Sequence, residues 1–369
     1  VPGETLLFLD EIQKSEDVVH SLWFFKEDYP ELHVIAAGSL LEFVLKDLSS
    51  FGVGRVSSLF VYPMSFDEFL TATGQEGLLR TKRNSSPTNP LPEAFYNRLV
   101  EAFRSYMLVG GMPEAVATYT ETGSYRYSSD IVNEIIQGYQ DDFAKYGAKA
   151  NPLLLRQTLI SVAHQAGAKF VYSRVEGQYR SAEVKVALEM LKDAGLIIPT
   201  YHTDANGVPL GAEINERVVK YLIHDTGVLL GILGIDDDID DSIKEMMVAD
   251  SINLVDKGHV AEMMAGLELI KYSSPQKRHQ LYYWQNMNKG TCAEVDYVIA
   301  RSGSIVPIEV KSGVKGSMSS MYSLMRNPQK HIEMGIRCSL ENFGTFESPD
   351  GKKIDIIPLY AISNLFAEK

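Results

Sequence analysis

The spacing of apolar and polar residues changes several times along the chain, and each change predicts a different kind of element. Short apolar runs bounded by polar residues, typical of buried strands, occur near both ends of the sequence. Between them apolar residues recur every three or four positions, the spacing of a helix that buries one face. We expect helices at residues 18–27, 93–109, 128–145, 153–165 and 182–194. The polar, proline-containing stretch 71–92 predicts a loop or an insertion.

The first apolar run, residues 5–9, ends in the two carboxylates Asp10 and Glu11. Such a run is typical of a buried parallel strand, and ligands bind at the carboxyl ends of strands in α/β sheets. A second apolar run, residues 33–37, is soon followed by the polar residue Ser39. For this stretch taken by itself, the alternative is an ordinary buried pair of α/β strands.

Near the other end, residues 294–311 predict two strands joined by the turn at residues 302–304. Glu309 and Lys311 are two positions apart on the second strand, so both side chains point to one face, which Asp296 can reach from the first strand. Burying such charges costs stability unless a partner compensates them. A divalent cation between the carboxylates, with the lysine at a water or a phosphate, would be such a partner. The alternative is a surface hairpin with a same-face salt bridge.

The order Asp…Glu-x-Lys resembles the core of the restriction-endonuclease-like (PD-(D/E)XK) superfamily. The resemblance implies that Asp296 and Glu309 hold magnesium and that Lys311 assists the attacking water, so Glu309 and Lys311 are its catalytic candidates. It also implies an acidic residue on a preceding helix, and Glu262, in a stretch with helical apolar spacing, is the candidate for this third metal ligand. Cleavage is a separate inference, because proteins that do not cut use the same core.

The N-terminal motifs together resemble a family of bacterial and archaeal AAA-type ATPases that carry a C-terminal domain of unknown function. That family shows an apolar strand ending Asp-Glu-Ile-Gln, a strand ending Gly-Ser, a Gly-Arg pair and a Pro-Leu-Ser-Phe-x-Glu segment. This chain has the corresponding residues in the same order, at 10–13, 38–39, 54–55 and 63–68. The resemblance extends to the C-terminal Glu-Val-Asp…Ile-Glu-Val-Lys signature, so it covers essentially the whole chain.

The resemblance assigns roles to four N-terminal residues. Asp10 would hold the nucleotide's magnesium, Glu11 would orient the attacking water, and Ser39 and Arg55 would contribute to nucleotide binding. The phosphate-binding loop G-x-x-x-x-G-K-[ST] does not occur in the 369 residues. Without it nucleotide affinity should largely vanish. We therefore expect ATP to bind only if a longer parent chain supplies the loop; the alternative is a truncated copy that has lost ATPase activity.

These patterns predict an α/β multidomain chain. We expect a partial AAA-type P-loop α/β domain, a helical connector, a winged-helix-like domain, an acidic linker and a restriction-endonuclease-like α/β domain at residues 1–72, 73–125, 126–235, 236–249 and 250–369. The winged helix is inferred from helices followed by a β-ribbon. Its helix at 182–194 exposes a mixed set of charges, which favours packing or protein contact over DNA contact.

Composition narrows the class of protein. The net charge of −13 argues against a surface that coats nucleic acid nonspecifically. However, residues 250–369 carry 14 Lys and Arg against 13 Asp and Glu, so a local nucleic-acid groove is compatible with this part. No apolar run approaches the ~20 residues of a membrane span, and two cysteines without a metal or redox motif fit a reducing cytoplasm. We expect a cytoplasmic protein with no membrane partner.

Taken together, the patterns favour ATP-linked work on nucleic acid, with Mg²⁺ at the C-terminal carboxylates and ATP in a longer parent. A homo-oligomer is implied by the resemblance to AAA-type domains. The competing class is a non-catalytic regulatory or scaffold protein that binds DNA or protein and keeps both folds without turnover. The sequence leaves these alternatives open.

Overall fold

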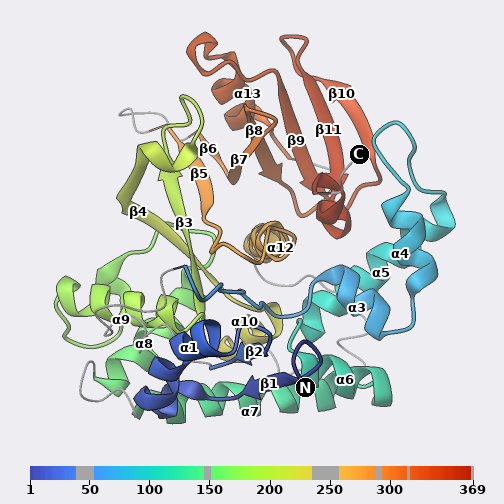
Figure 1. Cartoon of the computed structure of the whole chain (residues 1–369). Helices are drawn as coiled ribbons and strands as arrows, with labels where there is room; N and C mark the ends of the chain where they lie inside the picture. The colour runs from blue at the N-terminus through green and yellow to red at the C-terminus, as the bar shows by residue number, and fades with distance from the viewer. Residues whose placement is uncertain (39–53, 145–150, 235–256, 287–292, 314–315, 367–369) are drawn as a thin grey trace.

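The centre of the molecule is a single helix, α12, Lys257–Lys271. Figure 1 shows it end-on between a layer of helices at the bottom of the view and a twisted C-terminal sheet at the top. Every residue from Val260 to Ile270 is buried, including the carboxylates Glu262 and Glu268. Buried carboxylates need specific partners. The computed structural model describes residues 1–38, 54–144, 151–234, 257–286, 293–313 and 316–366.

The N-terminal part forms a small α/β unit, as expected. Strand β1, Leu6–Leu9, pairs in parallel with β2, His33–Ala36, and α1, Glu16–Asp28, runs between them in sequence. A short core on one side of this pair holds Ile12, Val19 and Leu22. The alternate residues of the strands point the other way and are exposed: Leu6, Phe8 and Ile35.

The helical region that follows contains an element in a stretch that the sequence analysis predicted to be a loop. Helix α4, Glu76–Arg83, lies inside the stretch 71–92 that was predicted to be a loop, so that prediction was wrong in part. The polar composition hid an amphipathic helix that buries Leu78, Leu79 and the whole side chain of Lys82. The neighbouring helices are α3, Phe66–Ala72; α5, Glu93–Val109; α6, Pro113–Thr122; and α7, Tyr125–Phe143.

The middle of the chain contains the expected helices and ribbon. Two helices precede the ribbon, α8, Pro152–His164, and α9, Ser181–Asp193, and α10, Thr226–Ile232, follows it. Strands β3, Ile197–Thr203, and β4, Ile214–Ile223, pair antiparallel. The ribbon does not end there, because β3 also pairs in parallel with β5, Leu281–Gln285, which in turn pairs with β6, Glu294–Val295.

The strands of this sheet, in the order β4-β3-β5-β6, come from both sides of the predicted acidic linker: β3 and β4 precede it in sequence, and β5 and β6 follow it. The linker residues, 236–249, lie outside the described residues. Within the described residues, a continuous hydrophobic core joins Phe66 to residues of α12 and onward to Ile362. The predicted domain boundaries remain predictions, but the middle and C-terminal parts are packed together through a shared sheet.

The C-terminal sheet has five strands in the order β10-β11-β9-β8-β7. Their bounds are β7, Tyr297–Arg301; β8, Ser304–Val310; β9, Met334–Ser339; β10, Gly344–Glu347; and β11, Lys353–Pro358. Strands β7 and β8 form the predicted hairpin, and both turn residues, Ser302 and Gly303, have positive φ of 49° and 77°, as a tight hairpin turn requires. The predicted hairpin is therefore confirmed, but the predicted first strand is split, because Glu294 and Val295 pair with β5 in the other sheet and β7 begins only at Tyr297.

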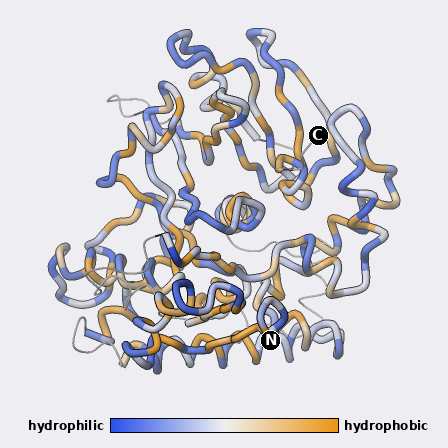
Figure 2. Tube along the Cα trace, in the orientation of Figure 1, coloured by the Kyte–Doolittle hydropathy of each residue, from blue (hydrophilic) through white to orange (hydrophobic). Residues whose placement is uncertain are grey.

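Alternate residues of β8 enter two different cores. Ile305 packs with residues of α13, Ser319–Arg326, whereas Ile308 belongs to the core that contains α12. The 3₁₀ helix η6, Leu359–Leu365, packs against α12. Figure 2 shows the hydrophilic stretches at the outer loops, including those at the top of the view. Within the described ranges, no helix is long and apolar enough to cross a membrane.

Candidate functional site

The structure places Asp296, Glu309 and Lys311 together at the open end of the β7–β8 hairpin. Tyr297 lies opposite Ile308 in the register, so one step further Asp296 falls opposite Glu309. Oδ2 of Asp296 accepts a hydrogen bond of 2.7 Å from the backbone N–H of Val310, and Nζ of Lys311 donates to Oε1 of Glu309 at 2.6 Å. The period-two argument from the sequence thus describes the local geometry of these three side chains.

Glu262 approaches this cluster from α12, but it is held by a residue that the sequence analysis missed. Nζ of Lys220, on β4, lies 2.8 Å from Oε1 of Glu262 and 2.5 Å from Oε1 of Glu294. The Lys220 side chain is almost fully buried, and its ammonium lies 5.0 Å from the centroid of the Tyr283 ring. The only sequence signal was a lysine at an inward position of an apolar strand, where lysine is rarely found.

The position of α12 relative to the sheet is set by a close contact one turn beyond Glu262. The hydroxyl of Tyr297 donates a hydrogen bond of 2.8 Å to the backbone oxygen of Glu262. Gly266 faces the same ring, and a Cβ there would lie 2.4 Å from the Tyr297 oxygen and 2.7 Å from Cδ1 of Leu222. Glycine therefore allows the helix to approach β7 closely enough for Glu262 to reach the cluster.

The carboxylates of the cluster are held in a setting that opposes their ionisation. Burial raises the pKa of Glu262 to about 8, and the charge of Asp296 adds to that shift against the opposing effect of Lys220. Burial likewise raises the pKa of Glu309 to about 7, and the pKa of Asp296 is also raised, again chiefly by burial. Burial by itself would lower the pKa of Lys220, but Glu262 and Glu294 outweigh it, so the net shift is upward.

These directions describe four carboxylates that share two ammonium groups. The charges of Asp296 and Glu294 each raise the pKa of both Glu262 and Glu309, so the two halves of the cluster are coupled. Arg337, opposite Glu309 on the neighbouring strand β9, is paired with Glu341 at 2.6 Å. The cluster therefore carries more negative than positive charge when its groups are ionised.

The chemistry of this donor set fits a divalent cation. Oε2 of Glu309 is buried and has no hydrogen-bond partner within the described part of the chain, which is the condition of an oxygen that lacks a ligand. Carboxylate oxygens are the protein ligands that Mg²⁺ prefers. Yet no group of three or more His, Cys, Asp or Glu side chains among the described residues is arranged to hold an ion. Glu262 and Glu294 turn toward Lys220, and Glu309 turns toward Lys311.

The nucleotide candidates of the N-terminal unit lie apart from this cluster in sequence and make contacts of their own. Asp10 and Glu11 follow β1 directly, as predicted, and Oε2 of Glu11 accepts a 2.6 Å hydrogen bond from Gln13. The guanidinium of Arg55 pairs with Glu27 of α1 at 2.5 Å. Ser39 lies outside the described residues. The roles of Asp10, Glu11, Ser39 and Arg55 in nucleotide binding and hydrolysis remain predictions.

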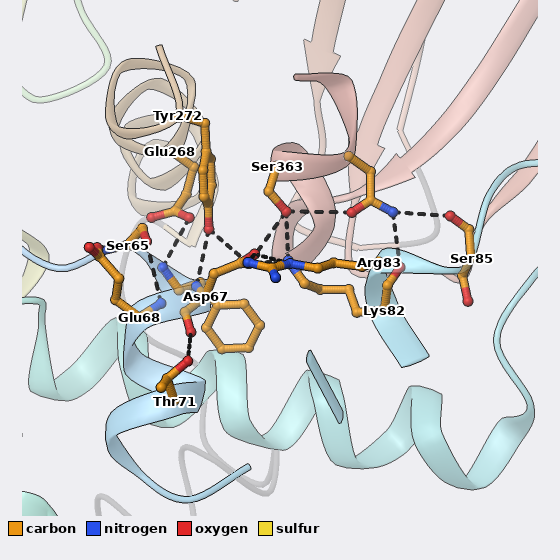
Figure 3. A network of polar contacts seen from close by, with 12 residues as sticks. Ser65, Asp67, Glu68, Thr71, Lys82, Arg83, Ser85, Glu268, Tyr272 and Ser363 are labelled. Carbon is orange, nitrogen blue, oxygen red and sulfur yellow. Dashed lines mark hydrogen bonds and ion pairs between the residues drawn. The ribbon is translucent and has the colours of Figure 1, made fainter. Parts of the chain in front are cut away.

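The segment at residues 63–68 has a clear structural role (Figure 3). Ser65 and Glu68 form a capping box at the start of α3. Asp67 binds the buried ammonium of Lys82 and accepts a 2.9 Å hydrogen bond from the hydroxyl of Tyr272, at the end of α12. The backbone N–H of Phe66 donates to Oε2 of Glu268 at 3.2 Å. This segment therefore anchors α3 to α12.

An open groove of about 720 Å³ lies beside the β3–β4 ribbon, and Lys185, His202 and Arg217 are among the residues that line it. Nε2 of His202 lies 3.1 Å from a backbone carbonyl oxygen of β5, so this nitrogen carries the proton and donates. Nδ1 is buried and lacks a partner within the described residues. The His202 ring packs 5.7 Å from that of Tyr283, the ring beside the candidate site. The Tyr283 ring therefore neighbours both His202, which lines the groove, and Lys220, which binds the carboxylate cluster.

Three family models match parts of the chain. Residues 1–70 match an "AAA domain", residues 100–239 a "Domain of unknown function (DUF8612)" and residues 257–362 a "Domain of unknown function (DUF4143)". The first and third matches support an AAA-type ATPase family. They cover the segments that carry the Asp10 and Asp296 motifs.

A search of curated proteins finds no match. Among solved structures, the chain is similar to the Walker-type ATPase PABY2304 of Pyrococcus abyssi, with 19% identity and a TM-score of 0.40. The similarity covers 63% of this chain and 63% of that one, so the chain spans less than two thirds of the length of that relative.

Proposed function

We propose that this AAA-family chain acts on nucleic acid through a divalent-metal site in its C-terminal part. The proposed metal ligands are Glu262, Asp296 and Glu309, and Lys311 is the residue that meets the substrate. The observation that carries the proposal is the buried Oε2 of Glu309, which has no hydrogen-bond partner among the described residues, in a cluster with more carboxylates than ammonium groups. Buried charge without compensation costs several kcal/mol, so such an arrangement implies a ligand.

The residues of the cluster would divide the work of phosphodiester hydrolysis. When bound, a divalent ion would supply Lewis-acid stabilisation of charge on the phosphate. Asp296 is positioned for this role, because the Val310 N–H donates to one of its carboxylate oxygens and orients the side chain. The Lys311 side chain is 21% exposed, so its ammonium can donate a hydrogen bond to a phosphate oxygen or to a water at the mouth of the site.

The N-terminal unit would contribute ATP-linked work. We propose that Asp10 and Glu11 serve nucleotide magnesium and water only where a longer parent chain supplies a phosphate loop. Their position at the carboxyl end of a parallel strand supports this role. The exposed apolar face of the same strands, Leu6, Phe8 and Ile35, is compatible with further elements packing there. Assembly into a homo-oligomer is part of the same proposal.

A second candidate is a non-catalytic scaffold, and one observation favours it. Lys220 places an ammonium between Glu262 and Glu294, where it partly neutralises the cluster without a metal. A lysine that does this permanently would leave a stable fold with no turnover.

Metal response separates the two candidates. We would measure the melting temperature against Mn²⁺ concentration, and the nicking of plasmid and single-stranded DNA, for the wild type, Asp296→Asn and Lys311→Ala. The enzyme should melt higher with Mn²⁺ and nick DNA. Asp296→Asn should lose both effects, and Lys311→Ala should keep the metal response but lose nicking. Metal-dependent melting without nicking would favour a binding module, and no response in any protein would contradict the metal site.

A further inference from the structure

Lys220 belongs to one matched region and reaches into another. It lies on β4, within residues 100–239, whereas both of its carboxylate partners, Glu262 and Glu294, lie within residues 257–362. The partners are 42 and 74 positions away in sequence. The contact is therefore made by the packing of the middle region against the C-terminal region, along the sheet that the two share.

The ammonium and a divalent ion would compete for the same oxygens. Oε1 of Glu262 and Oε1 of Glu294 both point at Nζ of Lys220, at 2.8 and 2.5 Å. An ion bound by Glu262 would have to approach that same oxygen region, and two cations at such a distance repel strongly in a buried site. The arrangement also explains why the carboxylates do not converge among the described residues, since Glu262 and Glu294 are drawn to Lys220 and Glu309 is drawn to Lys311.

The Lys220 ammonium has other partners nearby if it moves away from Glu262. Its ammonium already lies 5.0 Å from the Tyr283 ring, a distance at which a cation is attracted to an aromatic face. Glu294 is the more exposed of its two carboxylates, at 32% against 10% for Glu262. A small rotation of the lysine toward Glu294 and the ring would free Glu262 without exposing an unpaired charge.

We propose that Lys220 is a built-in competitor cation, which holds Glu262 in the metal-free protein and withdraws when a divalent ion binds. This inference rests on the proposed metal site. It makes the middle region a regulator of that site, because any shift of the β3–β4 ribbon relative to α12 moves the competing charge. The ligand is a hard divalent cation such as Mg²⁺ or Mn²⁺.

The test is calorimetric titration of Mn²⁺ into the wild type, Lys220→Met, Lys220→Arg and the control Lys185→Met. Lys185 is exposed on α9 and lies outside the cluster. Lys220→Met should bind Mn²⁺ about ten-fold more tightly than the wild type or better, because a competing charge is gone. Lys220→Arg keeps the charge and should stay near the wild type, as should Lys185→Met. The metal-free Lys220→Met protein should melt lower, because Glu262 loses its counter-charge.

The outcomes separate this inference from the proposed function. If Lys220→Met and the wild type bind Mn²⁺ equally while Asp296→Asn abolishes binding, the metal site stands and the competitor role of Lys220 is wrong. If neither the wild type nor Lys220→Met binds Mn²⁺, the proposed function falls, and this inference with it.

A measurement on the wild type covers the case in which Lys220→Met does not fold. A buried ammonium exchanges its protons slowly and gives a ¹H–¹⁵N NMR signal, which Lys220→Arg would assign. Saturating Mg²⁺ should shift that signal and speed its exchange. An unchanged signal at saturating Mg²⁺ would overturn the inference.

Discussion

Helix α12 carries two buried carboxylates six residues apart, and their surroundings differ in charge balance. At one end, Glu268 accepts hydrogen bonds from Tyr106 and from the backbone of Phe66, with Lys271 3.7 Å away. At the other end, Glu262 belongs to a cluster of four carboxylates that share two ammonium groups.

The network around Glu268 continues to Asp67, which has two cations of its own. Lys82 binds it from a fully buried position, and Arg83 pairs with it at 3.1 Å from a side chain that is 61% exposed. Lys82 also donates to the Ser363 hydroxyl at 2.7 Å, so the network ties α3, α4, α12 and η6 together (Figure 3). The charges of Asp67, Lys82, Arg83, Glu268 and Lys271 each lie within 4.0 Å of an opposite charge, although burial still lowers the pKa of Lys82.

We interpret this difference as separating a cluster that stabilises the fold from the cluster that we propose binds a ligand. A charge-balanced, fully bonded network stabilises one arrangement of helices. A cluster with excess like charge, raised carboxyl pKa values and an oxygen that lacks a partner among the described residues costs stability, and is expected where a bound ligand offsets that cost. The predictions below test this contrast, beginning with the largest expected effect.

Breaking the balanced network should be costly. Lys82→Met leaves Asp67 buried with its inner counter-charge removed, and loss of one partner of a buried pair costs roughly 3–5 kcal/mol. Urea unfolding would measure the loss. Arg83→Met is the matched control, since it removes the exposed partner of the same carboxylate and should cost less than about 1 kcal/mol. Equal, small losses from both would mean that the network does not stabilise the fold.

Pushing α12 away from β7 should disturb both stability and the site. Gly266→Ala would place a Cβ against Tyr297 and Leu222, and such overpacking costs about 1–3 kcal/mol. Because Glu262 moves with the helix, the Mn²⁺ response should weaken as well. Gly258→Ala, on the same helix, meets no atom within 4 Å and should be neutral or slightly stabilising. If Gly266→Ala were as benign as Gly258→Ala, the close approach would not position the site.

The metal-free protein should lose stability as pH rises through the range in which the cluster ionises. Glu262 and Glu309 have folded-state pKa values of about 8 and 7, against 4.5 for an ordinary glutamate, so the folded state holds extra protons between these values. The stability that these two groups contribute is therefore fully present below about pH 4.5. It declines as pH rises above that value and is lost once pH has passed through 7 and 8. Each group should contribute a loss on the order of 1 kcal/mol per pH unit.

Urea unfolding in EDTA at several pH values would check this slope. Glu309→Gln should reduce the loss, because one titrating group has gone. A flat or rising profile between pH 5.5 and 6.5, with no change in Glu309→Gln, would show that these carboxylates ionise freely in the folded protein.

The local parts of this account could be predicted from the sequence, and the long-range parts could not. Helix α5 spans the predicted residues 93–109, and the period of two placed Glu309 and Lys311 on one face. The contact between Lys220 and Glu262 joins strands and helices brought together only by the fold, so no local pattern encodes it. The same holds for Phe66 and Glu268, which are 202 positions apart.

The missed helix α4 shows a second limit. The polar residues and prolines of the stretch 71–92 made it look like a loop, because burial of Leu78 and Leu79 becomes visible only once α3 and α5 are in place. The role of Glu294 was also missed, although it begins the Glu-Val-Asp motif. Its partner lies on a strand 74 positions earlier.

The contrast between the two clusters can be tested with one matched pair of substitutions, Asp67→Asn and Asp296→Asn. Both remove a charge from a buried aspartate and keep its shape. The measurement is the free energy of unfolding of each variant and the wild type, in EDTA and in Mn²⁺ at ten times its dissociation constant. At that concentration a single bound ion should stabilise the wild type by about 1.4 kcal/mol.

We predict that Asp67→Asn is less stable than the wild type in EDTA but keeps the full gain from Mn²⁺. Asp296→Asn should be at least as stable as the wild type in EDTA, because like-charge repulsion is relieved, and should show no gain from Mn²⁺. The account is contradicted if Asp296→Asn is the destabilised variant in EDTA, or if both variants respond to Mn²⁺ as the wild type does.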